Sequence, residues 1–191
     1  MITRRLAVLA IGATVLLTAG CGNSGGGASA DPTPTRITSV SLQLRPVVTE
    51  VEAKGSDCDL AVVSTPPLIK PIPKICNVDK TVLYSLGKAV VGQNQVKTVE
   101  LVDLPGSPSE KAAVLTLDAP GTAAFAGITG DASKKDSPKN QVALVVDGQV
   151  VSSPEVSKET GPITGGSLQV SFADGAAAKA FYDSWPAERQ K

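Results

Sequence analysis

The sequence predicts an α+β fold in which two helices pack on one face of a mainly antiparallel sheet. Three observations lead to this prediction. Short segments with alternating polar and apolar residues recur along the chain, and two of them are joined by an Asp-Gly dipeptide, which is typical of a tight hairpin. Two segments have the apolar spacing of a helix, and each follows a group of strands. About 155 residues follow the N-terminal region, a length that suits one domain.

The first 20 residues have the pattern of a signal peptide. A basic start at 1–5 precedes an uncharged apolar run at 6–17, and small residues lead from there to Cys21. This run suits a signal-peptide core and is shorter than the roughly 20 residues that span a bilayer. Small residues before a cysteine resemble a lipobox, although Thr18 stands where leucine is more common. The resemblance implies a lipid on Cys21 and cleavage before it; the alternative is an ordinary signal peptide with an unmodified cysteine.

Residues 21–36 carry the expected lipid site and a linker of Gly, Ser, Ala, Pro and Thr with almost no apolar content. Such a composition cannot bury enough surface to offset its ordering entropy, so it predicts a flexible tether that spans roughly 20 Å. We therefore expect three parts: a signal peptide at 1–20, the lipidated linker at 21–36 and one folded domain at 37–191. We expect the protein to lie at the outer face of the cell membrane, held by lipid.

The charge balance excludes nucleic acid as an expected partner. The chain has 18 basic and 18 acidic residues, and cleavage before Cys21 would remove Arg4 and Arg5, leaving a net charge of −2. Phosphate binding needs a basic patch, and a polybasic membrane clamp needs clustered lysines or arginines. The overall balance favours neither.

Two cysteines remain after Cys21 is assigned to the lipid. Cys58 and Cys76 are 18 positions apart, and two cysteines in an oxidising compartment most simply form a disulfide. The alternative is a pair of free buried thiols. We expect no metal site, because the chain has no histidine and no further cysteine to complete one.

The first half of the domain predicts strands around a proline-rich connection. Apolar residues alternate with polar ones from Val40 to Leu44, which indicates a half-buried strand, and Pro46 indicates an edge position or a bulge. The segment 53–79 contains four prolines at positions 66, 67, 71 and 73, which favour extended, polyproline-like chain rather than helix. A short apolar segment follows at 81–86.

The middle of the domain predicts two strands and then a helix. The segments 96–104 and 111–117 are apolar and are separated by turn residues at 105–108. Asp118 is a candidate N-cap, and a proline and apolar residues at helical spacing follow it, so we expect a helix that ends before a polar loop at 130–139.

The last third predicts a hairpin, a strand and a helix. The apolar segment 141–146 and the returning segment 149–152 flank Asp147-Gly148, which predicts an antiparallel hairpin. A loop at 157–166 leads to a strand at 167–172, and 176–185 has the apolar spacing of an amphipathic helix ended by proline.

The residue types argue against catalysis. A nucleophile with a histidine base is excluded because the chain has no histidine, and no Ser-x-x-Lys motif offers a lysine instead. The glycine-rich stretches at 22–27 and 161–166 lack the Gly-Lys-Ser/Thr of a phosphate loop. Asp57 and Asp59 flank a cysteine, a pattern that is usually only solvated. We expect neither enzymatic activity nor a cofactor.

Two stretches of the C-terminal half resemble a known family. The first is VALVVDGQVVSSP at 142–154, and the second is ITGGSLQVSF at 163–172, followed by an alanine-rich helix. This order is similar to the head subdomain of the large periplasmic region of SecD, part of the SecDF membrane complex. Ser153 stands where that family usually has alanine.

The N-terminal half resembles the same subdomain more weakly. LQLRPV at 42–47 is similar to its opening strand, and LGKAVV at 86–91 with 111–129 is similar to its middle section. The resemblance covers roughly 38–185, and it implies a SecDF-head-like α+β fold that binds unfolded polypeptide outside the membrane. It does not imply the proton-driven motor, because no membrane span with a buried carboxylate is expected after residue 20.

Two hypotheses for function follow. The first is a non-catalytic, lipid-anchored module that contacts exported polypeptides or the Sec translocon. The second is an envelope lipoprotein that uses the same fold to bind a small ligand or a cell-wall component. Loops on a rigid scaffold commonly carry binding, so the expected partner-binding residues lie at the end of the hairpin and in the next loop. They are Ser152, Pro154, Glu155, Ile163, Gly165 and Gly166.

Overall fold

The structure is a computed structural model that describes residues 40–54, 56–58, 68–104, 107–172 and 174–191. The expected signal peptide, the lipid site at Cys21, the linker and the turn residues at 105–106 lie outside the described residues. So do Asp59 and the prolines at 66 and 67.

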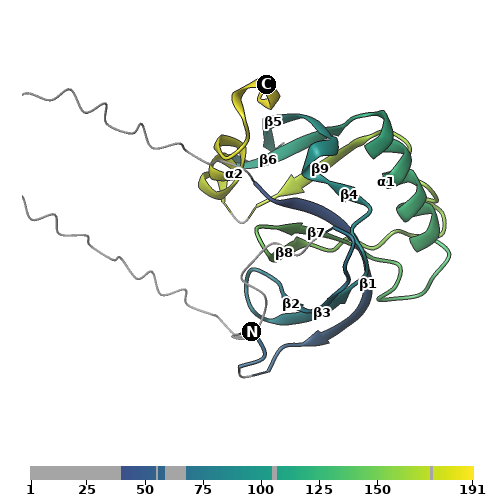
Figure 1. The fold of residues 1–191 in the computed structure, drawn as a ribbon. Coiled ribbons are helices and arrows are strands. Elements are labelled where there is room, and N and C mark those ends of the chain that lie inside the picture. Colours follow the sequence, from purple (N-terminus) through teal and green to yellow (C-terminus); the bar gives the residue numbers. More distant parts are fainter. Residues whose placement is uncertain (1–39, 55, 59–67, 105–106, 173) are drawn as a thin grey trace, which may run out of the picture. The chain divides into compact units, whose positions relative to one another are not determined.

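Nine strands and two α-helices are present in the described part of the chain (Figure 1). The strands are β1 (Leu42–Glu52), β2 (Ile72–Cys76), β3 (Val82–Leu86), β4 (Val91–Gly92), β5 (Val96–Leu104), β6 (Ser107–Leu117), β7 (Val142–Val146), β8 (Gln149–Ser152) and β9 (Ser167–Ser171). The helices are α1 (Ala119–Ala132) and α2 (Gly175–Asp183), with short 3-10 helices at Gln93–Gln95 and Ala187–Arg189. The predicted α+β class is confirmed.

The strands form two antiparallel sheets rather than the single sheet that was expected. The larger sheet has the order β2-β3-β1-β7-β8, with β4 also paired to β1, and the smaller has the order β5-β6-β9. The larger sheet curls, because Asn77, just after β2, forms a parallel bridge with Val150 of β8. Helix α1 contacts strands of both sheets, whereas α2 contacts β5 and β6 (Figure 1).

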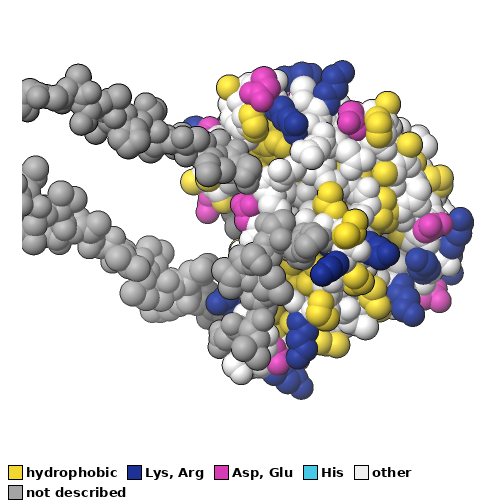
Figure 2. Space-filling model, viewed as in Figure 1, with side chains coloured by type: hydrophobic (Ala, Val, Ile, Leu, Met, Phe, Trp, Pro, Cys, Tyr) yellow, Lys and Arg dark blue, Asp and Glu magenta, His cyan; other side chains and the backbone are white. Residues whose placement is uncertain are grey.

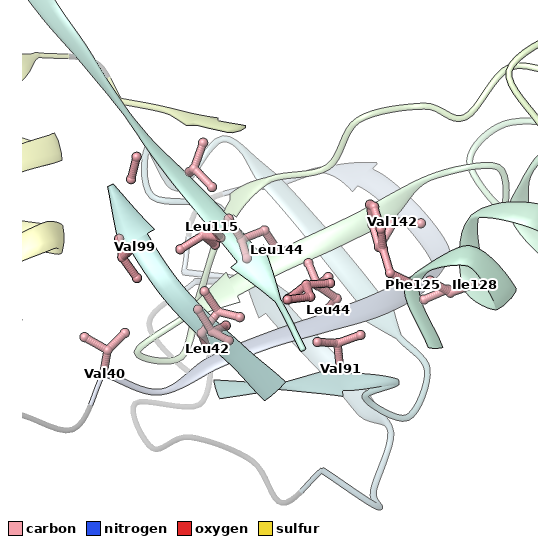
Figure 3. Close-up of a cluster of buried hydrophobic side chains, with 14 of the residues drawn as sticks. Val40, Leu42, Leu44, Val91, Val99, Leu115, Phe125, Ile128, Val142 and Leu144 are labelled. Atoms are coloured by element: carbon pink, nitrogen blue, oxygen red, sulfur yellow. The ribbon is translucent and has the colours of Figure 1, made fainter. Parts of the chain in front are cut away.

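Two cores account for the alternation of side chains in β1 and β7. Leu42 and Leu44 of β1 join a cluster with Leu115 of β6 and with Phe125 and Ile128 of α1 (Figure 3). On its opposite face β1 contributes a valine to a second cluster, inside the curl of the larger sheet. That cluster contains Val47, Ile72, Ile75, Tyr84, Leu86, Ala143, Val145 and Val150. The first half of β1 and nearly all of β7 are therefore buried on two faces.

Arg45 lies on the second of these faces, and 0% of it is exposed. Its Nε donates to Oε1 of Gln43, and one terminal nitrogen donates to the backbone oxygens of Lys70 and Gly87, each at 2.7 Å. Burial lowers the pKa of Arg45, although a guanidinium stays protonated in proteins. The side chain therefore links β1 to the segment just before β2 and to the residue just after β3.

The local signals for the hairpin and for the start of α1 are confirmed. Asp147 and Gly148 have φ angles of 46° and 81°, as a two-residue turn between twisted strands requires. The Asp118 carboxylate accepts a hydrogen bond from the backbone N–H of Gly121 at 2.7 Å, so it caps α1. Asp174 caps α2 through Ala177 in the same way.

Several boundaries differ from the predictions. Helix α1 continues through Ala132, into the segment that was expected to be loop, and β6 begins at Ser107. The proline-rich connection contains a strand, β2, which was not expected. Pro73 falls at an irregularity of register between Ile72 and Ile75, on a strand at the end of its sheet, and these are the places where a sheet tolerates proline.

The predicted bulge in β1 is present, and the predicted disulfide is confirmed. The register of β1 against β3 shifts between Val47 and Thr49, directly after Pro46, although β1 is a central strand. Cys58 and Cys76 are joined with their Cα atoms 5.7 Å apart. The bond ties the chain that enters the proline-rich connection to the end of β2.

Candidate functional site

Four of the six residues predicted for partner binding line one pocket. Ser152 and Pro154 come from the end of β8, Glu155 follows them, and Ile163 lies in the loop before β9. These side chains are exposed or half-buried. The structure therefore brings together positions that are up to 11 residues apart in sequence, at the end of the larger sheet.

The inner wall of this pocket is apolar and comes from four other elements. Its remaining lining residues are Leu44 of β1, Phe125 and Thr129 of α1, Val142 and Leu144 of β7, Val156, and Leu168, Gln169 and Val170 of β9. The pocket thus opens from the first core between the two sheets. Its volume is about 110 Å³.

The loop at 157–166 is held along α1. The Ile163 N–H donates to Oγ1 of Thr129 at 2.9 Å. A Cβ on Gly130 would lie 3.2 Å from Cβ of Pro162, so the loop lies directly against the helix. These contacts hold Ile163 at the pocket.

The two predicted glycines do not line the pocket. Gly166 has a φ of +63°, and a Cβ there would lie 2.4 Å from Oγ1 of Thr122. Its carbonyl accepts a hydrogen bond from the Leu117 N–H at 2.7 Å. Gly166 is therefore needed for the tight entry into β9, whereas a Cβ on Gly165 would meet nothing within 4 Å.

Strand β9, which contributes to the wall of the pocket, lies at the end of its sheet. It pairs with β6 along Ser167–Ser171, and within the described residues no strand pairs with its other edge. Ser167, Gln169 and Ser171 are exposed, whereas Leu168 is half-buried and Val170 is buried. An unpaired edge next to an apolar pocket can add an extended chain by main-chain hydrogen bonds.

A polar group lies on the other side of the β8 end. The hydroxyls of Tyr84 and Ser153 share a hydrogen bond of 3.0 Å, and Nε2 of Gln141 donates to Glu50 at 2.7 Å. Burial raises the pKa of Tyr84, the hydrogen bond to Ser153 opposes that increase, and the charge of Glu50 adds to it. Ser153, which stands where the resembling family usually has alanine, therefore has a structural partner.

We expect Tyr84 to make stability depend on pH in the alkaline range. Because the folded state raises the pKa of Tyr84, its stabilising effect is present below about pH 10 and is lost as pH rises through the folded-state value. The free energy of unfolding, measured with urea from about pH 8 to about pH 11, should fall more steeply for the wild type than for Tyr84→Phe. At neutral pH the variant should lose about 1 kcal/mol with its hydrogen bond. Parallel pH curves would contradict this role.

The sequence interpretation missed most of the pocket. Phe125, Thr129 and Leu144 carry no signal of their own, since each also fits an ordinary core position. The free edge of β9 depends on strand order, which the sequence does not show.

Within the described residues, no group of three His, Cys, Asp or Glu side chains is placed to hold a metal ion. None of the helices in that part of the chain is long and apolar enough to cross a bilayer.

Comparison with known proteins finds a curated relative and several similar structures, two of which are described below. SecD, the protein translocase subunit of Streptomyces coelicolor, is 35% identical over 88 residues, which are 46% of this chain and 15% of SecD. A structure of SecDF in a super-membrane-facing form has a TM-score of 0.48 and 16% identity, and covers 73% of this chain and 17% of that one. A second structure, of SecDF as a membrane component that enhances protein export, has a TM-score of 0.46 and 16% identity. The match covers 73% of this chain and 59% of that one.

No family model matches the chain. The chain spans less than a sixth of the length of the SecD relative, so the similarity concerns a part of that protein only. The SecD resemblance that the sequence motifs predicted is thereby supported for about half of the chain. This protein contains a domain that is partially and distantly related to SecD.

Proposed function

We propose that this protein is a lipid-anchored, extracytoplasmic module that binds segments of exported polypeptide in extended form. The observation that carries the proposal is the apolar pocket next to the unpaired edge of β9. The edge offers main-chain hydrogen bonds, which do not depend on the sequence of the bound segment. The pocket accepts one apolar side chain of that segment. Together they suit a chain that has not yet folded.

The size of the pocket favours a side chain over a free small ligand. Sites for drug-sized ligands have volumes of roughly 300–1,000 Å³, whereas this pocket measures about 110 Å³. An engineered cavity of about 150 Å³ holds one benzene, so this smaller pocket suits a leucine or valine side chain. Ser152 and Glu155 form a polar, exposed rim around it. The small-ligand hypothesis receives no support from this geometry.

Two observations support the cellular setting. The signal-peptide pattern and Cys21 indicate export and a lipid anchor, and the relative that matches 46% of the chain is a protein translocase subunit. The module acts beside the translocation machinery, at the outer face of the membrane. It has no role as a motor and acts by holding an emerging segment close to the bilayer.

Ser152→Trp should block the pocket and weaken peptide binding. Ser152 is exposed, so a larger side chain there covers the mouth without entering the core. Loss of one buried apolar side chain from a complex costs about 1.5–3 kcal/mol, which is roughly a 10- to 150-fold increase in Kd. Fluorescence anisotropy with a labelled, unfolded segment of an exported protein measures this Kd. Gln149→Trp is the matched control, because it lies on the same strand, is exposed and does not line the pocket.

Backbone recognition is tested with the same peptide methylated at alternate main-chain nitrogens. Methylation removes the donors that a strand edge needs, so binding should fall at least tenfold while the side chains stay unchanged. In cells, a photocrosslinker at Ser152 should capture exported polypeptides or translocon subunits. Equal peptide affinity for both Trp variants, together with no such capture, would overturn the proposal.

A further inference from the structure

A second exposed surface lies on a different side of α1 from the pocket. We call it the Ile69 surface; it consists of Leu68, Ile69, Lys70, Lys88, Val90, Lys135 and Lys139. Three apolar side chains form its centre, and Ile69 is 75% exposed. The four lysines are all exposed. On the face that Figure 2 draws, Lys or Arg side chains lie next to exposed hydrophobic ones.

Hydrogen bonds hold the apolar centre in place. The Ala89 N–H donates to the carbonyl of Leu68 at 2.9 Å, which joins the two segments that carry it. Buried Arg45 donates to the carbonyls of both Lys70 and Gly87 at 2.7 Å. Ile69 is therefore presented to solvent by two segments that are tied to the core.

Two of the four lysines line a groove next to this centre. Val90 lines the groove together with Lys135 and Lys139, and its volume is about 370 Å³. Asp131 is the one acidic residue of this lining. Its Oδ1 lies 3.6 Å from Nζ of Lys134, so its charge is paired with a further lysine. The Ile69 surface is thus basic, although the mature chain is expected to carry a net charge of −2.

We propose that the Ile69 surface docks on an anionic lipid bilayer. Exposed apolar side chains enter the headgroup region, and lysines around them bind anionic headgroups. Charge complementarity selects this partner over a second copy of the chain, which would bring lysines against lysines. The inference rests on the proposed lipid anchor, whose predicted tether of roughly 20 Å keeps the domain within reach of the membrane.

Docking in this way leaves the peptide site open. Phe125 and Thr129 of α1 line the pocket, whereas Ala124 and Ile128 of the same helix line the groove. The two surfaces lie on different sides of one helix. A docked domain therefore still presents its pocket and the β9 edge to a passing polypeptide.

Lysine footprinting on the processed full-length protein in vesicles tests the docking. The vesicles contain phosphatidylcholine alone or mixed with phosphatidylglycerol, and acetylation of each lysine is read by mass spectrometry. In the anionic vesicles Lys70, Lys88, Lys135 and Lys139 should be protected, whereas exposed Lys97 on β5 should not change. Raising the salt concentration should remove the protection, because it screens exposed charges.

Two variants with a matched control decide the outcome. Each lysine near an anionic surface lowers the Kd for the bilayer about fivefold. The double variant Lys70→Gln with Lys88→Gln should therefore raise this Kd roughly 25-fold. Ile69→Asp should abolish the protection, whereas Val51→Asp, at another exposed apolar residue, should keep it. Vesicle flotation reports the anchor separately. Floating protein with uniform acetylation overturns the docking alone, and protein that does not float overturns the anchor.

Discussion

Replacing Arg45 with methionine is expected to lower the free energy of unfolding by about 3–5 kcal/mol. The guanidinium satisfies Oε1 of Gln43 and the carbonyls of Lys70 and Gly87 inside the larger sheet. Methionine has a similar length but no donor, so buried acceptors lose their partners, at about 1–3 kcal/mol for each group left unsatisfied. Urea denaturation measures the loss as a lower midpoint at constant slope.

Arg45→Lys is the control for charge. An ammonium is a compact donor and cannot reproduce the planar fork that reaches three acceptors on separate segments. This variant should therefore lie between the wild type and Arg45→Met. If Arg45→Met lowers the free energy of unfolding by less than about 1 kcal/mol, the Arg45 hydrogen bonds are not a determinant of stability. A partial loss would also loosen Lys70 and Gly87, and thereby the support of Ile69.

Reducing the disulfide is expected to cost about 3 kcal/mol, because the bond closes a loop between residues 18 positions apart. For a domain of this size, the loss corresponds to a fall in Tm of roughly 6–12 °C. Differential scanning calorimetry with and without a reductant measures the change. The bond joins Cys58 to the end of β2, so its loss should first release the proline-rich connection.

The double variant Cys58→Ala with Cys76→Ala separates the bond from the effects of the reductant. It should unfold at the temperature of the reduced wild type, and the reductant should not change it further. An identical Tm for the oxidised and reduced wild type would show that the connection is already constrained by β2. In that case the pairing of Ile75 with Tyr84 would hold it.

Short sequence motifs predicted the hairpin turn and the start of α1, because the conformation of each depends on only a few adjacent residues. The turn at Asp147-Gly148 needs positive φ at two adjacent positions, and the α1 cap needs a carboxylate three residues before Gly121. Strand β2 was missed because proline predicts extended but unpaired chain. Its pairing depends on β3, a separate segment, and on a register shift around Pro73.

The candidate site was predicted at its rim and not at its wall. Ser152, Pro154, Glu155 and Ile163 follow strands or turns that the sequence marks, and the structure places all four around one pocket. The wall draws on β1, α1, β7 and β9, which only the fold brings together. Gly165 and Gly166 were predicted as binding residues, and the structure does not place them in the pocket lining.

By itself, the sequence determined the fold class, the hairpin, the start of α1 and the disulfide, because each depends on residue type and short spacing. Tertiary structure decided that the strands divide into two sheets, that β9 ends one of them, and that a pocket opens between the cores. It also gathered lysines from positions 70 to 139 on one surface of a chain that is neutral overall. The physical reason is that strand order and surface clustering come from packing between segments that are distant in the sequence. The local pattern around an apolar or basic residue is the same whichever strand or surface it finally joins, so the sequence pattern does not reveal these features.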